Sequence, residues 1–140
     1  MKNIWQAISK KDLIFGLIIL ALVIIISIAR PSQNVKTIYD TDAVDVKSTK
    51  FSMNIPYEMV SRLELADLPD LGENVDGYNN RVIQTGLWRN DTWGEYQACL
   101  DLACETCIVV YLNDGQIFVV SLRNADDTAA SYEEFQKHIQ

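Results

Sequence analysis

Three cysteines lie within the nine residues CLDLACETC, from Cys99 to Cys107. The spacing C-x4-C-x2-C opens plant-type iron–sulfur sites, and C-E-T-C taken alone has the form of a redox dithiol. An iron–sulfur cluster of that type takes a fourth thiolate from further along the chain, yet no cysteine follows Cys107 and His138 is the only histidine. The pair Cys104 and Cys107 also lacks the helix amino terminus that activates a thioredoxin-like thiol. The spacing therefore does not predict a cluster or a redox centre.

A zinc site formed by the three sulfurs and a carboxylate from Asp101 or Glu105 would require this short loop to wrap the metal alone, so we expect no metal. The cysteines lie where one strand ends and the next begins. A hairpin would bring Cys99 opposite Cys107, which favours a disulfide between them on an oxidising side of a membrane, with Cys99 to Cys104 as the second choice. The alternative, of at least equal weight, is that the cysteines serve only as small buried apolar residues or as loop residues.

Four aromatic residues, Tyr78, Trp88, Trp93 and Tyr96, fall within 19 residues, close to the long acidic loop expected over residues 67–80, DLPDLGENVDGYNN. Exposed tryptophan and tyrosine are favoured as anchors of binding surfaces. One interpretation is a groove lined by Trp88 and Trp93 that receives an extended peptide, as an added strand along a sheet edge. The other is that these rings fill the inside of a small barrel.

A 17-residue run without charge, from Leu13 to Ala29, predicts a transmembrane helix. Residues 1–12 would form a short polar segment before it, and a cleaved signal peptide is the competing interpretation. Lysine and arginine are balanced on the two sides, so the positive-inside rule hardly discriminates. The closely spaced Lys10 and Lys11 favour a single-pass protein of the cell membrane with its following domain outside.

The net charge changes sign where the apolar run ends, after residue 29. Residues 1–29 carry three lysines and one aspartate, whereas residues 30–140 carry nine basic and 18 acidic residues, net −9, so that the whole chain reaches −7. Phosphate groups attract clustered lysine and arginine, so the acidic part is not expected to bind nucleic acid or, strongly, anionic lipid.

Residues 30–49 are polar with scattered apolar positions and are expected to form a linker. From residue 50 onward, short β-rich runs follow one another: FSMNI, VSRLELA, RVIQTGLW, GEYQACL, CIVVYL and IFVVSL. Asp114-Gly115 predicts a hairpin between the last two runs. Residues 125–139 change to helical periodicity, with Asn124 as the cap. The pattern predicts about six strands and one closing helix.

The span 51–139 resembles a bacterial PH-like domain. The resemblance rests on MNIPYEMVSRLEL, QTGLW, TWGEY, IVVYLNDGQIFVVSL and DTAASYEEFQ, in that order. It implies that residues 50–140 form a bent antiparallel sheet or open barrel of about six to seven strands capped by a carboxy-terminal helix. It does not imply phosphoinositide binding, the family offers no general catalytic residues to carry over, and the cysteine cluster departs from the family.

The sequence holds no glycine-rich phosphate loop, no pair of histidines and no base beside a nucleophile, so we expect no enzyme and no cofactor. The expected function is that of a membrane-anchored interaction module that binds a protein or peptide partner, or that serves as a small subunit of a membrane complex. The alternative is a thiol-based redox or metal-binding membrane protein that uses the cysteine cluster.

Overall fold

The computed structural model describes residues 9–29 and 34–140, and the side chains of residues 27–29 lie outside the description. Two units are present, one ending at Ser32 and the other running from Gln33 to Gln140. The first unit contains the helix α1 (Lys10–Ala29). Ser9 caps its start, because its side-chain oxygen accepts from the backbone N–H of Asp12 at 3.2 Å, while the backbone N–H of Ser9 donates to the carboxylate of Asp12.

The expected transmembrane helix over 13–29 is contradicted. Helix α1 begins with three charged residues, and its uncharged part, Leu13–Ala29, is 17 residues long. At 1.5 Å per residue this part extends about 25 Å, less than a hydrocarbon core of about 30 Å. Within the described ranges no helix is both long and apolar enough to cross a membrane. This finding also contradicts the expectations of a single-pass protein of the cell membrane and of an outward-facing domain.

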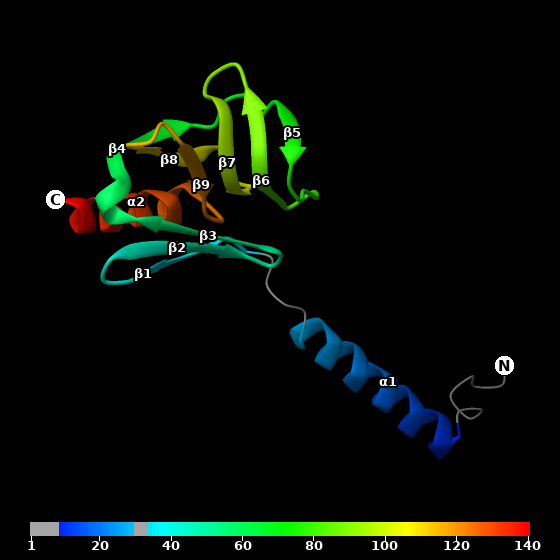
Figure 1. The fold of residues 1–140 in the computed structure, drawn as a ribbon. Helices are drawn as coiled ribbons and strands as arrows, with labels where there is room; N and C mark the ends of the chain where they lie inside the picture. The colour runs from blue at the N-terminus through cyan, green and yellow to red at the C-terminus, as the bar shows by residue number, and fades with distance from the viewer. Residues whose placement is uncertain (1–8, 30–33) are drawn as a thin grey trace. The chain divides into compact units, whose positions relative to one another are not determined.

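Over its described residues, 34–140, the second unit consists of nine strands, one 3-10 turn and a closing helix, arranged as Figure 1 shows. The strands are β1 (Lys36–Tyr39), β2 (Ala43–Ser48), β3 (Phe51–Pro56), β4 (Val60–Asp67), β5 (Glu73–Asp76), β6 (Ile83–Asn90), β7 (Gly94–Asp101), β8 (Thr106–Leu112) and β9 (Ile117–Ser121). The turn η2 (Tyr57–Met59) separates β3 from β4, and the helix α2 (Ala125–Ile139) follows β9.

The strands form two sheets, one in the order β1-β2-β3 and one in the order β4-β8-β9-β7-β6-β5. Neighbours are antiparallel except for β7 and β9, which are parallel. A single bent antiparallel sheet of six to seven strands is therefore not what this chain forms. The polar stretch expected to be a linker contributes β1 and β2, and the long loop contributes β5.

Two apolar clusters lie on opposite faces of the six-stranded sheet, as the alternation of side chains along β8 and β9 requires. The first is enclosed by the three-stranded sheet and α2, and it includes Val44, Ile55, Val110 and Phe135. The second is covered by the segment 68–71 that joins β4 to β5. This segment is fastened to the sheet, because the hydroxyl of Tyr96 donates to the carbonyl oxygen of Leu71 at 2.6 Å.

Helix α2 follows the pattern expected from the sequence. Asn124 is its cap and its side chain accepts a hydrogen bond from the backbone N–H of Asp127 at 2.8 Å. Thr128 and Phe135 are buried on the face that packs against the sheets. The expected hairpin at Asp114-Gly115 is also present, with β8 and β9 antiparallel and Gly115 at φ +87°.

Candidate functional site

The four aromatic residues singled out in the sequence do not form one surface. Trp88 and Tyr96 are 5% and 1% exposed and belong to the second apolar cluster. Trp93 packs edge-to-face on Tyr96, with ring centroids 5.1 Å apart. Burial raises the pKa of Tyr96 to about 12, which fits a phenol held inside the fold. The predicted groove lined by Trp88 and Trp93 is therefore not open, because Trp88 is buried and Trp93 is partly buried on the same cluster. Tyr78 is the most exposed of the four, at 37%.

The cysteines are free thiols and lie on different faces. Strand β9 lies between β7 and β8, so Cys99 and Cys107 are two strands apart rather than opposite one another. Cys99 belongs to the first apolar cluster and Cys107 to the second. The expected disulfide between Cys99 and Cys107 is consequently absent from this structure, and Cys104 also remains unpaired with another cysteine.

Cys104 has a local role in the connection between β7 and β8. It is 2% exposed, and its thiol donates to the carbonyl oxygen of Thr106 at 3.1 Å and lies 3.5 Å from the hydroxyl of Thr128. That contact ties the connection to the first turn of α2. Among the side chains that the structure describes, no three histidine, cysteine or acidic residues gather so that they could hold a metal ion.

We predict that the three thiols resist alkylation in the native protein. All are 2% exposed or less, and burial raises the pKa of both Cys99 and Cys107 to about 12, so little reactive thiolate forms at neutral pH. Iodoacetamide at pH 8 should leave the native chain unmodified and label three sites in urea, as read by intact mass. Rapid native labelling of Cys104 or Cys107 would contradict this packing and favour a reactive thiol pair.

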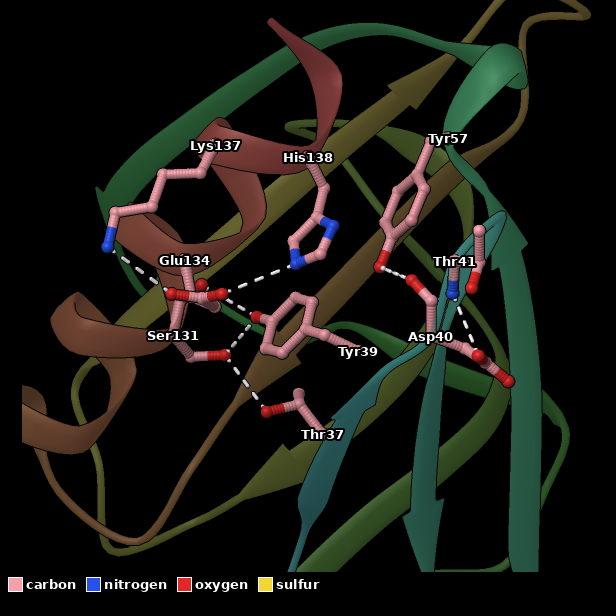
Figure 2. A network of polar contacts seen from close by, with 9 residues as sticks. All are labelled: Thr37, Tyr39, Asp40, Thr41, Tyr57, Ser131, Glu134, Lys137 and His138. Carbon is pink, nitrogen blue, oxygen red and sulfur yellow. Dashed lines mark hydrogen bonds and ion pairs between the residues drawn. The ribbon is translucent and has the colours of Figure 1, made fainter.

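A second notable cluster surrounds the only histidine, at the end of α2 (Figure 2). The imidazole of His138 lies between two tyrosine rings, 5.4 Å from that of Tyr39 and 4.9 Å from that of Tyr57, and nearly parallel to both. Its Nε2 is 3.3 Å from the carboxylate of Glu134. Sequence reasoning missed this cluster, because its members are up to 99 residues apart.

The polar ends of the two tyrosines are also occupied. The hydroxyl of Tyr39 donates to the carbonyl oxygen of Ser131 at 2.6 Å, and the hydroxyl of Tyr57 donates to the carbonyl oxygen of Asp40 at 3.0 Å. Burial raises the pKa of Tyr39. These contacts join α2 to β1 and to η2, so we interpret the cluster as the fastening of the helix to the three-stranded sheet.

The exposed apolar side chains point to another region. In the described part of the second unit, five large apolar side chains are exposed, and three of them lie within eight residues: Val75 at 44%, Tyr78 at 37% and Val82 at 44%. The other two, Ile38 and Leu65, are isolated in the sequence. We call the segment 73–82, which comprises β5 and its connection to β6, the edge segment.

Hydrogen bonds hold the edge segment in one conformation. The backbone N–H and the hydroxyl of Thr85 both donate to the carbonyl oxygen of Tyr78, at 2.9 and 2.8 Å. The side-chain oxygen of Asn80 accepts from the backbone N–H groups of Val82 and Ile83. A surface that is already ordered loses less conformational entropy when a partner binds.

Charge differs between the two ends of the edge segment. Asp70, Glu73 and Asp91 surround its beginning, beside a hollow of about 460 Å³ that Gly72 and Asn90 also line. Arg89 lies in the same hollow, but its guanidinium pairs with Glu95. The later end carries cations instead. There Arg81 belongs to the segment, and the ammonium of Lys50 lies 4.6 Å from the centre of the Tyr78 ring.

Comparison with models of protein families, with curated proteins and with solved structures found no match to this chain. The resemblance to a bacterial PH-like domain thus has no support from these comparisons.

Proposed function

We propose that this protein is a non-catalytic interaction module that binds a protein partner through the edge segment. The observation that carries the proposal is the concentration of three exposed apolar side chains, Val75, Tyr78 and Val82, in one short and ordered segment. Exposed apolar residues scattered singly need no explanation, whereas a concentration of them is typical of an interaction site. A tyrosine within such a site is favoured as an anchor.

The arrangement of the rest of the domain supports a binding role. Trp88 and Tyr96, which could have lined a ligand pocket, are packed in the interior. The thiols are buried, and the imidazole of His138 stacks on two tyrosine rings while its side chain stays 30% exposed. The surface that remains accessible carries the apolar side chains of the edge segment with acidic residues beside them, and such a surface suits recognition of another chain.

The proposal is tested by site-specific photocrosslinking in cells that produce the full chain. A photoreactive phenylalanine analogue replaces Tyr78 in one variant and Leu65 in a control, because these two side chains are almost equally exposed, at 37% and 39%. We expect position 78 to give a discrete adduct with one protein, identified by mass spectrometry, and position 65 to give none. Absence of an adduct at position 78, or equal and heterogeneous labelling at both positions, would overturn the proposal.

A further inference from the structure

Strand β5 is an outer strand of the six-stranded sheet, and it is short, irregular and exposed. It pairs only with β6, and all four of its residues are exposed. Its register with β6 shifts between Asn74 and Asp76, which indicates a bulge at Val75. An outer strand of this kind directs backbone N–H and C=O groups away from the sheet, where another chain can pair with them.

The strand is fixed in place although it pairs over few residues. The residue after its end, Gly77, approaches β6 so closely that an added Cβ atom would collide with the carbonyl oxygen of Thr85. The side-chain amide of Asn74 donates to the carbonyl oxygen of Gly77 at 2.9 Å, which closes the turn after the strand. The edge therefore presents a defined line of backbone groups.

The acidic residues on the exposed edge of β5 decide which kind of chain can pair with it. Glu73 and Asp76 lie on the strand itself, and Asp70 and Asp91 lie beside its first residue. A second copy of the chain would bring the same acidic strand against this one, and like charges directly opposite one another destabilise a strand pair. Charged outer strands are a common protection against self-association. A partner with basic residues escapes that repulsion.

Resting on the proposed function, we infer that the partner adds an extended, basic segment to β5 as a further strand of the sheet. Main-chain hydrogen bonds to β5 provide the pairing, and side chains provide the selectivity. The basic residues of the partner lie at the Glu73 end, where Asp70 and Asp91 are close. Its apolar residues lie at the other end, near Tyr78, where Lys50 and Arg81 disfavour further cations.

Three synthetic peptides test the inference with the full chain. The first alternates lysine and valine over eight residues, the second has glutamate in place of each lysine, and the third repeats the first with alternate backbone nitrogens methylated, which removes N–H donors but keeps the charge. Amide hydrogen exchange of residues 73–76 is measured by NMR in each mixture. We expect the first peptide alone to slow exchange in β5, and Glu73→Lys to weaken its binding about tenfold or more.

The matched control is Glu133→Lys, which makes the same charge change on α2 and should leave binding of the lysine peptide nearly unchanged. Equal binding of the methylated peptide would show that attraction between charges, not strand pairing, is responsible, and would overturn the inference. If the amide hydrogens of β5 exchanged slowly in the protein without peptide, and the protein sedimented as a dimer, the chain that pairs with β5 would be a second copy. That result would also overturn the inference.

The two proposals can fail separately. If Tyr78 crosslinks to one partner while no peptide slows exchange in β5, the interaction module stands and the strand addition does not. If the lysine peptide slows exchange in β5 but position 78 gives no adduct in cells, the edge can accept a basic strand and the proposed cellular function fails.

Discussion

Trp88→Ala is expected to lower the free energy of unfolding by about 3–5 kcal/mol, the usual cost of removing a large buried aromatic side chain. The ring is 5% exposed and packs in the cluster that contains Tyr96, Leu100 and Val109. Its Nε1 also donates to the carbonyl oxygen of Thr85 at 2.9 Å, so alanine both leaves a cavity and removes this buried hydrogen bond.

Urea unfolding of the full chain, followed by circular dichroism, measures this loss. Trp93→Ala is the companion variant, because Trp93 packs on the rim of the same cluster and is only partly buried. It should be clearly less destabilising. If Trp88→Ala unfolded at nearly the wild-type urea concentration, the ring would have to lie on the surface, and a binding groove formed by the two tryptophans would need to be reconsidered.

Gly86→Ala is expected to lower the free energy of unfolding by about 3 kcal/mol, from backbone strain and overpacking together. Gly86 has φ +90°, a conformation that residues with a Cβ atom rarely adopt. The added Cβ would also lie 2.5 Å from the carbonyl oxygen of Asp76 and from the Cα of Gly77. The substitution would therefore push the end of β5 away from β6.

Gly94→Ala is the matched control, since Gly94 also has positive φ, +72°, but a Cβ there meets open space. It should cost only about 1 kcal/mol, the strain of the backbone alone. Hydrogen exchange supplies the second readout, because Gly86→Ala should speed exchange in residues 83–90 next to β5 and Gly94→Ala should not. Equal destabilisation by both variants would contradict the close approach of β5 to β6.

The strands with strong apolar alternation could be predicted from the sequence. The run FSMNI is β3, the run VSRLELA lies within β4, and CIVVYL and IFVVSL are the hairpin of β8 and β9. Helix α2 and its Asn124 cap also follow from periodicity and local hydrogen bonding. In these segments the local pattern and the tertiary environment favour the same structure.

The strands and contacts that were predicted wrongly, or not predicted, from the sequence have physical causes. In β2 the buried Val44 and Val46 alternate with Asp45 and Lys47, which is a strand signal that the polar composition of the whole stretch hid. In β5 all four residues are exposed, so no apolar alternation marks it, and only pairing with β6 makes it a strand. The cysteine prediction assumed that consecutive strands are neighbours, but β9 separates β7 from β8.

The candidate site was even less accessible to sequence reasoning. Tyr78 could be named as an aromatic of interest, but nothing in the sequence distinguishes it from Trp88 or Tyr96, which are buried. Exposure depends on which face of which strand a residue occupies, and that depends on the strand order. The large apolar side chains of α1 from Leu13 to Ile26 are between 47% and 66% exposed, and these exposed fractions likewise come only from the structure.

Strand β9 is the last strand of the six-stranded sheet in the sequence but lies in its interior. Among the described strands, β9 alone pairs with both β7 and β8, so without residues 117–121 the strands β4 and β8 would form one group and β5, β6 and β7 another. A released chain truncated before residue 117 would therefore leave β7 and β8 as two unpaired sheet edges, which are the kind of surface that promotes aggregation and that chaperones cover.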